Sequence, residues 1–406
     1  MAVSVSRAVA AGIRDHFMSL PGWARVFVLT FALYGIPAAT KATWFTTHSH
    51  LAYAILNGSF SLPAPYGTTE IVHWPNGEKY VAYGVTPSFF LMPFVAILGR
   101  GVHQPVCSAI FGAAGVACFW AFLGHMKGVS EHSRKWLTIL LAAGSPFAYY
   151  AAENGGNWSI THSVAVVCLL ACMLLSRTGN PGWAGLFFGL GVLSRNPVLY
   201  LAPAMVLVLW APEAESWREI RPDWRKLAVF LVGFGVAALI GAYYNWARFD
   251  TPFENGYTHI LNNDPIADFG RKPAFALEYA RHNVQHYLFN PPIRYDRFPW
   301  YGPDIAGMSM FLAFPALLLL PLARFRRPLV QVALACMLVV QAMYWVFIGD
   351  GRGQFGMRYT TDYLPMVMLL LMTALGTRFG RFAQVLTVLG FLVEIWGFAT
   401  WRANGW

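Results

Sequence analysis

Apolar stretches long enough to cross a lipid bilayer recur along this whole chain, and their repetition limits the folds open to it. A transmembrane helix needs about 20 mostly apolar residues. The sequence is 57% hydrophobic and only 12% charged, whereas charged residues make up about a quarter of an ordinary soluble domain. The composition therefore excludes a soluble domain and predicts an all-α polytopic membrane protein.

Eleven spanning helices are predicted from the apolar stretches. They lie near 25–43, 105–126, 135–152, 158–176, 181–194, 197–212, 227–247, 305–323, 328–348, 361–377 and 382–400. With the N-terminus inside, the inner connections and the N-terminal segment hold 16 lysine and arginine residues, and the short outer connections with the C-terminal tail hold four. Basic residues accumulate on the cytoplasmic side, so the net charge of +10 indicates topology rather than nucleic-acid binding. We expect a multi-pass membrane protein with a cytoplasmic N-terminus and its two long loops, with any active face, on the extracytoplasmic side.

Two long outer loops are predicted, over 44–104 and 248–304, within a single membrane domain of 1–406. The apolar segment 88–99 is too short to cross the bilayer comfortably, so we expect it to be a juxtamembrane or re-entrant helix. In "EIVHWPNGEKYVAYG", alternating residues flank a Pro-Asn-Gly turn, which predicts a small hairpin.

Two histidines follow the first span in "TWFTTHSHLAYAILNG", and no carboxylate lies between them and Glu70. One interpretation makes His50 or His48 a general base, since imidazole titrates near neutral pH. A second has both rings, with Glu70 or His73, bind a divalent metal such as Mg²⁺ or Mn²⁺; this requires an extended turn, because residues two apart on a helix face different ways. A third has the rings only hold the loop by hydrogen bonds.

Other polar residues lie at the predicted outer membrane edge. The segment "ENGGNWSITH" carries Glu153 and His162, and ionisable groups at that depth usually face a cavity or a partner, although a solvated turn would explain them too. Arg195 in "SRNP" needs an anion there, either a protein carboxylate or a ligand phosphate. In "IGDGRGQFGMRYTTDYLP", glycines allow close backbone approach and Arg352 and Arg358 suit an oxyanion; the alternative is an Arg358–Asp362 pair at helix spacing.

The chain resembles the GT-C superfamily of polyprenyl-phosphate-sugar-dependent glycosyltransferases, and within it a bacterial branch similar to rhizobial lipopolysaccharide glycosyltransferases. The matching stretches run in order over nearly the whole chain: "HLAYAILNGSFSL", "GEKYVAYGVTPSFFLMPFVAILG", "GGNWSITHSVAVV", "GLGVLSRNPVLYLAP", "NWARFDTPFENGY", "DIAGMSMFLAFPALLLL" and "GQFGMRYTTDYLP". Enzymes of this superfamily typically carry an acidic residue just after the first span. This chain departs from them, because it reads "FTTHSHLAY" there.

The resemblance implies a GT-C-like bundle with juxtamembrane helices that transfers a sugar from a polyprenyl-phosphate donor to an acceptor hydroxyl. The acceptor would be a glycan or lipid, in cell-envelope or lipopolysaccharide assembly. The catalytic candidates are His50, His48, Glu153 and Glu70. The candidates for binding the donor phosphate are Arg352, Arg358, Arg195 and Lys79. The candidates for substrate contact are Asn157, His162, Tyr80, Tyr83, Trp158, Asn245, Gln354 and Tyr359. No metal ligand is assigned.

Two other classes of function remain open. A lipid-linked-sugar flippase or transporter would have repeated broken helices and binding groups near the bilayer midplane. The sequence offers one such break, at "SRNP", and its polar residues cluster at the outer edge, which favours an enzyme. A non-catalytic membrane assembly subunit stays open because the usual acidic residue is missing.

Overall fold

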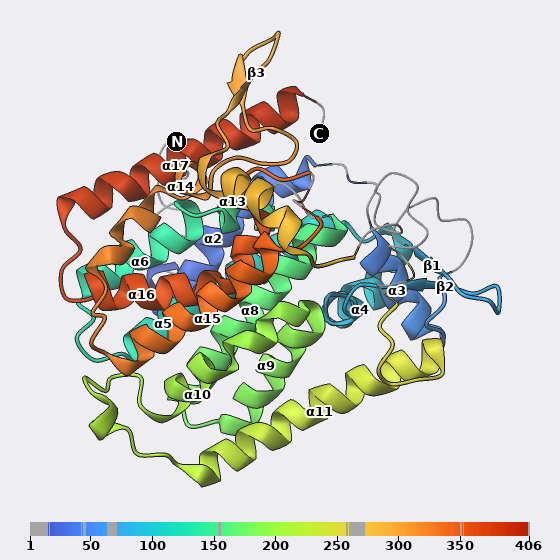
Figure 1. Cartoon of the computed structure of the whole chain (residues 1–406), viewed down its shortest axis with the longest axis horizontal. Helices are drawn as coiled ribbons and strands as arrows, with labels where there is room; N and C mark the ends of the chain where they lie inside the picture. Colours follow the sequence, from blue (N-terminus) through green and yellow to red (C-terminus); the bar gives the residue numbers. More distant parts are fainter. Residues whose placement is uncertain are drawn as a thin grey trace, which may run out of the picture.

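The computed structural model describes residues 15–62, 71–152, 156–256, 259 and 273–404, apart from positions 16, 42, 44, 45, 350 and 352. Within these residues, six helices are long and apolar enough to cross a membrane. They are α2 (Gly22–Ala39), α5 (Gln104–Gly124), α8 (Asn157–Arg177), α11 (Trp224–Phe249), α15 (Pro328–Trp345) and α17 (Arg381–Ala403) (Figure 1). The predicted all-α membrane fold is confirmed.

The other predicted spans correspond to shorter helical pieces, so the count of eleven is not confirmed. These pieces are α6 (Glu131–Ala143), α7 (Phe147–Ala152), α9 (Pro181–Ser194), η2 (Asn196–Leu201), α10 (Ala202–Trp210), α14 (Met310–Ala313), η6 (Pro315–Leu322), η7 (Arg358–Tyr363) and α16 (Leu364–Leu375). A proline lies at each junction between two pieces. Proline breaks a continuous helix there, because it lacks an N–H and clashes with the preceding turn. Pro146, Pro197, Pro315 and Pro365 each lie just before or within the first turn of the second piece.

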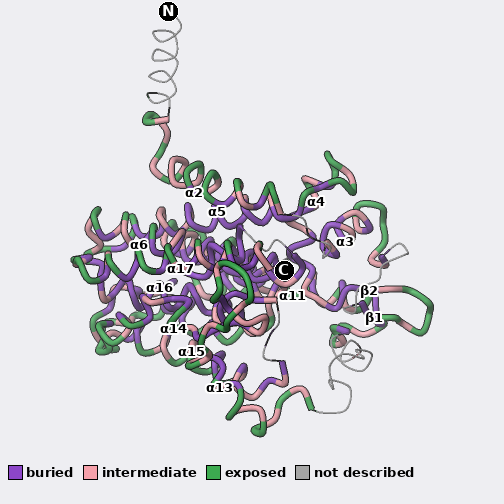
Figure 2. Tube along the Cα trace, turned by 90° about the horizontal axis from the view of Figure 1, so that it is seen from above, coloured by how far each residue is buried: buried purple, intermediate pink, exposed green. Residues whose placement is uncertain are grey.

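Helix α8 is the centre of the bundle. Of the residues in its most apolar 18-residue stretch, 89% are buried inside the protein. The same fraction is 17% for α2, which lies at the edge of the molecule in Figure 2. Phe119, Phe122, Leu137 and Phe147 belong to the main core around it. A polar residue on α8 is therefore surrounded by protein rather than by lipid.

Helices α9 and α11 touch backbone to backbone through glycine. A Cβ on Gly185 would lie 1.8 Å from the carbonyl oxygen of Phe230, and one on Gly233 would lie 1.9 Å from that of Gly182. Close packing of small residues is a usual source of helix association where hydrocarbon surrounds the helices. It fixes α9, and with it the residues just after α9, against the long α11.

The first predicted outer loop contains two helices and a hairpin. They are α3 (Thr47–Leu56), α4 (Thr86–Leu98), a short turn η1 (Gly99–Gly101), and the strands β1 (Ile71–His73) and β2 (Lys79–Val81). The predicted hairpin is confirmed, with Ile71 paired to Val81 and His73 to Lys79. Helix α3 was not predicted, and it places the two histidines that follow the first span in a helix rather than in an extended turn.

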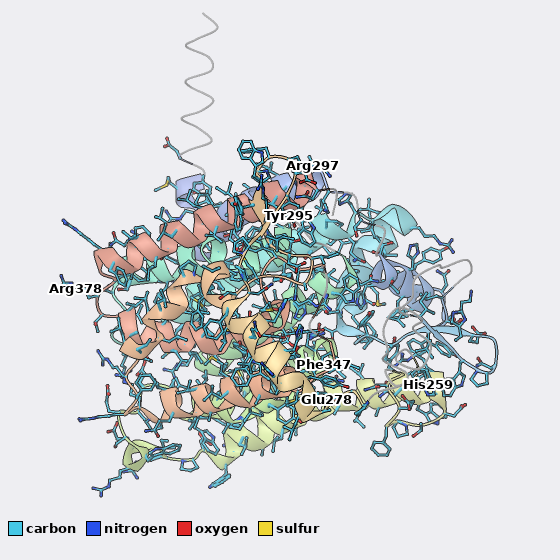
Figure 3. The ribbon with its side chains drawn as sticks, turned by 45° about the horizontal axis from the view of Figure 1, so that its top comes forward. His259, Glu278, Tyr295, Arg297, Phe347 and Arg378 are labelled. Carbon is cyan, nitrogen blue, oxygen red and sulfur yellow. The ribbon has the colours of Figure 1, made fainter. Side chains whose placement is uncertain are left out.

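The second predicted outer loop is anchored over the end of α15. It contains η5 (Leu277–Tyr279), α13 (Ala280–Phe289), and the paired strands β3 (Ile293–Arg294) and β4 (Tyr301–Gly302). The side-chain amide of Asn283 donates to the carbonyls of Tyr344, Trp345 and Phe347 at 2.7–3.2 Å, and these carbonyls lie at the frayed C-terminus of the helix. Figure 3 shows Glu278 of η5 near Phe347 on this side of the molecule.

The basic connections gather at one end of the molecule. The turns before α6, α11, α15 and α17 lie at the left of Figure 1, and α3, α4 and the hairpin lie at the right. In Figure 3, Arg378 marks the first end and His259 the opposite one. At the basic end, Glu215 binds Arg324 and Arg327, while Glu213 binds Lys127 and Arg177. A short 3-10 turn, η3 (Trp217–Glu219), lies among these connections. The orientation of the two ends in the membrane stays a prediction.

Candidate functional site

A buried carboxylate joins four separate elements of the bundle. Asp362 of η7 is fully buried and accepts from Nε and Nη2 of Arg195 at 3.1–3.2 Å. Nδ1 of His162 lies 2.6 Å from Oδ1 of the same carboxylate, and the Tyr344 hydroxyl also donates to the carboxylate. Arg195 therefore has a protein carboxylate as its counter-ion, which is one of the two alternatives raised by the sequence.

The helix break after α9 explains how Arg195 reaches Asp362. Arg195 is in an extended conformation (φ −144°, ψ 106°) between α9 and η2, which has a proline in its first turn. Just before it, the Ser194 hydroxyl donates to the carbonyl of Thr161 at 2.7 Å. That bond ties the break to α8 one residue before His162, so Arg195 and His162 face the same carboxylate.

A row of aromatic and cationic side chains extends from this cluster. The rings of Tyr344 and Tyr359 are stacked, with centroids 4.4 Å apart and planes 8° apart. The guanidinium carbon of Arg358 lies 5.0 Å from the Tyr359 ring and 5.1 Å from the ring of Trp158. Such contacts stabilise a cation that is removed from water. Arg358 is thus a buried positive charge between two aromatic faces.

The row continues to the first loop. The indole N–H of Trp158 donates to the Tyr83 hydroxyl at 3.1 Å, and the His48 ring lies 6.2 Å from the ring of Tyr83. One residue before Trp158, the side chain of Asn157 accepts from the backbone N–H of Thr47 at 2.8 Å. The start of α8 and the start of α3 are therefore held together at the end of the bundle opposite the basic connections.

A glycine-rich turn positions Arg358. Gly351 and Gly353 have φ of 86° and 65°, a region that glycine adopts at little cost. The side chain of Gln354 accepts from the backbone N–H of Arg358 at 3.0 Å and donates to the carbonyls of Ala306 and Gly351. Gln354 thus links this turn to the segment just after the second loop, and a close approach of the glycine backbone to a ligand stays a prediction.

The two histidines of α3 have different surroundings, because residues two apart on a helix point in different directions. His48 is fully buried, its Nδ1 lies 3.1 Å from Oγ of Ser88, and burial lowers the pKa of His48 to about 3. His50 is only partly buried, and burial together with Arg100 lowers its pKa. Both rings are weaker bases than free imidazole.

The helical conformation of α3 also removes the extended turn that the two histidines would need to bind one metal ion together. In the described part of the chain, no group of three or more His, Cys, Asp or Glu side chains is arranged to hold a metal ion.

Several predicted site residues lie elsewhere or outside the described residues. Lys79 and Tyr80 are in the hairpin, where Tyr80 packs on Phe249 with ring centroids 5.5 Å apart. Asn245 donates to the carbonyl of Pro252 at 3.1 Å and accepts from Arg248. Three predicted candidates fall outside the described residues: Glu70, Glu153 and Arg352.

The assignment of site residues from the sequence omitted Tyr344 and used Asp362 only as a local partner. The alternative Arg358–Asp362 pair at helix spacing is wrong, because Asp362 binds Arg195 and His162, while Arg358 donates to the Tyr359 hydroxyl at 3.2 Å. The signal available in the sequence was an arginine and an aspartate, Arg195 and Asp362, each at the predicted outer membrane edge. Sequence spacing does not tell which distant charge each one meets.

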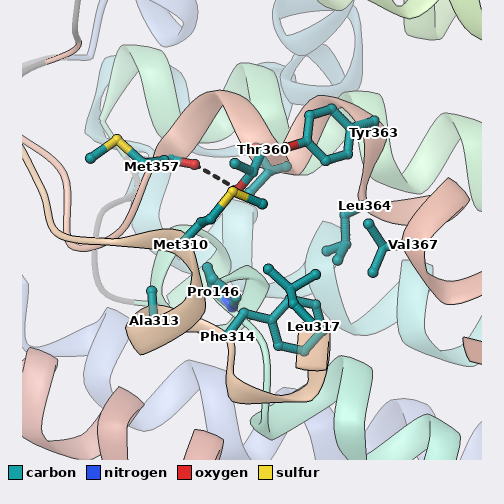
Figure 4. A pocket seen from close by; sticks show the side chains of 11 residues that line it. Pro146, Met310, Ala313, Phe314, Leu317, Met357, Thr360, Tyr363, Leu364 and Val367 are labelled. Carbon is teal, nitrogen blue, oxygen red and sulfur yellow. Dashed lines mark hydrogen bonds between the residues drawn. The ribbon is translucent and has the colours of Figure 1, made fainter. Parts of the chain in front are cut away.

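Two hollows in the described part of the chain lie apart from this row. A narrow cavity of about 10 Å³ lies behind η7, between Met310, Phe314 and Thr360 (Figure 4), and has room for about one water molecule. A wider apolar groove of about 420 Å³ runs between α2, α6 and α17.

No protein-family model and no curated protein matches the sequence. Solved structures do match: apo ArnT from Cupriavidus metallidurans has a TM-score of 0.56 at 16% identity, over 91% of this chain and 62% of ArnT. ArnT bound to undecaprenyl phosphate gives a TM-score of 0.52 at 15% identity, over 92% and 63% of the two chains. The apo oligosaccharyltransferase of Archaeoglobus fulgidus gives 0.51 at 13% identity, over 94% and 56%. The chain spans about three fifths of the length of these proteins, and it has their fold, the GT-C fold, as the sequence resemblance implied.

Proposed function

We propose that this protein transfers a sugar from a polyprenyl-phosphate-linked donor to an acceptor hydroxyl at the extracytoplasmic face of the membrane. The observation that carries the proposal is Arg358, a buried guanidinium held between the rings of Trp158 and Tyr359 in a GT-C fold. The similarity to ArnT, which has been solved with undecaprenyl phosphate bound, supports the class of donor lipid.

In the proposed reaction, the acceptor oxygen attacks the anomeric carbon of the donor sugar while the bond from that carbon to the phosphate oxygen breaks. The electron pair of the broken bond leaves with the phosphate, and the acceptor proton passes to a base. Positive charge that is fixed in a low-dielectric site stabilises a departing phosphate more than it would in water. Arg358 takes this role, with the rings of Trp158 and Tyr359 beside its guanidinium.

Aromatic faces near the phosphate would hold the sugar. Trp158 and Tyr83 are linked by a hydrogen bond, and their rings lie on the path from Arg358 to the first loop. Hydroxyls and ring nitrogens at the edge of an aromatic side chain allow both stacking and polar contact. The charge separation between the ends of the molecule supports an extracytoplasmic site, since the basic connections would face the cytoplasm.

Lipid binding by the purified full-length protein tests the proposal. We would measure binding of undecaprenyl phosphate and of undecaprenol by native mass spectrometry, for wild type, Arg358→Gln and Arg358→Lys, with Arg378→Gln at the opposite end as the matched control. A charge-assisted hydrogen bond contributes about 1.5–3 kcal/mol, which corresponds to roughly 10–100-fold in affinity. We therefore expect Arg358→Gln to lose about that factor for undecaprenyl phosphate only.

The other outcomes have definite meanings. Equal binding of undecaprenol and undecaprenyl phosphate by wild type would show that the phosphate is not recognised. Equal binding by Arg358→Gln and wild type would remove Arg358 from the site. Movement of a lipid-linked sugar across a liposome membrane without cleavage of its sugar–phosphate bond would favour a flippase over a transferase.

A further inference from the structure

His162 has its hydrogen-bonding state fixed by its neighbours. Asp362 is a bidentate partner of Arg195, so its carboxylate is ionised and offers only lone pairs. The ring nitrogen that faces it, Nδ1 of His162 at 2.6 Å, must therefore carry the hydrogen. In a neutral imidazole the other nitrogen, Nε2, is then a hydrogen-bond acceptor.

Nε2 of His162 is buried, and no described residue donates a hydrogen bond to it. His162 itself is 1% exposed on the central helix α8. Leaving a buried polar atom without a partner is unfavourable, and native proteins seldom tolerate such atoms without a reason. The atom is therefore ready to meet a donor that the described residues do not supply.

The surroundings of the ring suggest what that donor is. The rings of Tyr150 and Tyr359 each lie 6.1 Å from the imidazole, and Arg358 lies against the same Tyr359 ring at 5.0 Å. A carboxylate behind an imidazole, an unoccupied acceptor in front of it and a cation beside it form a set suited to proton abstraction near a leaving anion. The carboxylate holds the ring in one tautomer and stabilises the imidazolium that forms.

We infer that His162 is the general base that accepts the proton of the acceptor hydroxyl, with Asp362 as its positioning residue. The inference rests on the proposed transferase function and deepens it. The acceptor O–H bond breaks, its proton goes to Nε2, the oxygen bonds to the anomeric carbon, and the phosphate leaves with the electron pair toward Arg358. His48 of α3 faces the hydroxyl of Ser88 through Nδ1, whereas His162 faces a carboxylate, which stabilises an imidazolium.

Two separate measurements test this role. The first is binding of undecaprenyl phosphate, by native mass spectrometry. The second is release of free undecaprenyl phosphate from undecaprenyl-phosphate-linked sugars in a total lipid extract of the cells that make the protein, measured by mass spectrometry. The key variant is His162→Asn, whose amide still donates to Asp362 but cannot take a proton. His125→Asn, at an exposed position, is the matched control.

We expect His162→Asn to bind undecaprenyl phosphate within about twofold of wild type and to release it 100-fold or more slowly, since general-base catalysis typically contributes about 10²–10⁴-fold. Release within about threefold of wild type would overturn the inference and leave the transferase intact. Loss of both binding and release in His162→Asn would show a structural role and also overturn it. Failure of wild type to release undecaprenyl phosphate, with His125→Asn behaving the same, would instead refute the transferase function and the inference with it.

Discussion

Arg195 and Asp362, 167 residues apart in the chain, form a bidentate ion pair with both nitrogens 3.1–3.2 Å from the carboxylate oxygens. The Asp362 side chain is fully buried, and that of Arg195 is 17% exposed. The pair joins the break after α9 to η7, and Tyr344 adds α15 through its hydroxyl. It is therefore a structural link between three parts of the bundle as well as the support of His162 on α8.

Removal of Asp362 should be strongly destabilising, because it leaves the Arg195 charge buried without a counter-ion. Loss of one partner of a buried pair costs about 3–5 kcal/mol. We expect Asp362→Ala to lower the free energy of unfolding by that amount, measured by titration with a denaturing detergent. The matched control is Glu131→Ala, whose pairs with Arg134 and Lys135 are exposed, and it should cost about 1 kcal/mol or less.

A double variant separates the unpaired charge from the lost packing. Replacement of both partners, as in Arg195→Met with Asp362→Leu, should recover much of the stability lost by Asp362→Ala, since apolar substitutes for a buried ion pair are often neutral. If the double variant is no more stable than Asp362→Ala, the loss does not come from an uncompensated charge.

Two glycines on α11 offer a test of the backbone contact between α9 and α11. A Cβ on Gly233 would lie 1.9 Å from the carbonyl oxygen of Gly182, whereas a Cβ on Gly235 would meet nothing within 4 Å. Gly233→Ala should lower the free energy of unfolding by about 1–3 kcal/mol through overpacking. Gly235→Ala should leave it unchanged or raise it by up to about 1 kcal/mol. Equal effects of the two variants would mean that the helices are not in backbone contact.

Glu394 of α17 should matter through one hydrogen bond. It is 1% exposed, and one carboxyl oxygen accepts from the backbone N–H of Tyr149 at 3.1 Å, in the first turn of α7. Glu394→Leu would leave that buried N–H without a partner, at a cost of about 1–3 kcal/mol. Glu394→Gln keeps an acceptor oxygen and should stay close to wild type in the same unfolding titration; an equally large loss in both variants would point to the charge rather than the bond.

Local patterns in the sequence predicted local structure well. The Pro-Asn-Gly turn predicted the hairpin that pairs Ile71 with Val81, and each apolar stretch predicted a helical segment. Proline explains why some stretches form two short helices, but it did not reveal the break in advance, since "SPF" and "FPA" lie inside continuous apolar runs. The count of eleven spans is therefore not confirmed by the six described helices that are long enough to cross a membrane.

The candidate site was harder to predict, because it is built from distant contacts. The sequence singled out Arg195, His162, Arg358, Trp158 and Tyr359 by residue type and position, and the fold brings them together. It did not reveal that Arg195 and His162 share Asp362. Charge pairing at helix spacing offered Arg358 as an alternative partner for that carboxylate, and only the packing of α8, α9 and α15 decides otherwise.

The buried neutral state of His48 should make stability depend on pH. Burial lowers the pKa of His48 from about 6.5 in the unfolded chain to about 3 in the folded protein. Between these values the unfolded chain binds a proton that the folded protein does not, so stability is complete above pH 6.5 and falls as the pH decreases toward 3. By pH 5 the loss should be roughly 2 kcal/mol, at about 1.4 kcal/mol for each pH unit.

We would measure unfolding in detergent at pH 7.5 and pH 5.0 and compare wild type with His48→Gln. The variant should show a smaller pH dependence, with a remainder from His50, whose pKa is also lowered. The exposed-site variant His125→Gln should keep the wild-type dependence. An unchanged pH dependence in His48→Gln would show that water reaches the ring and that α3 does not bury it.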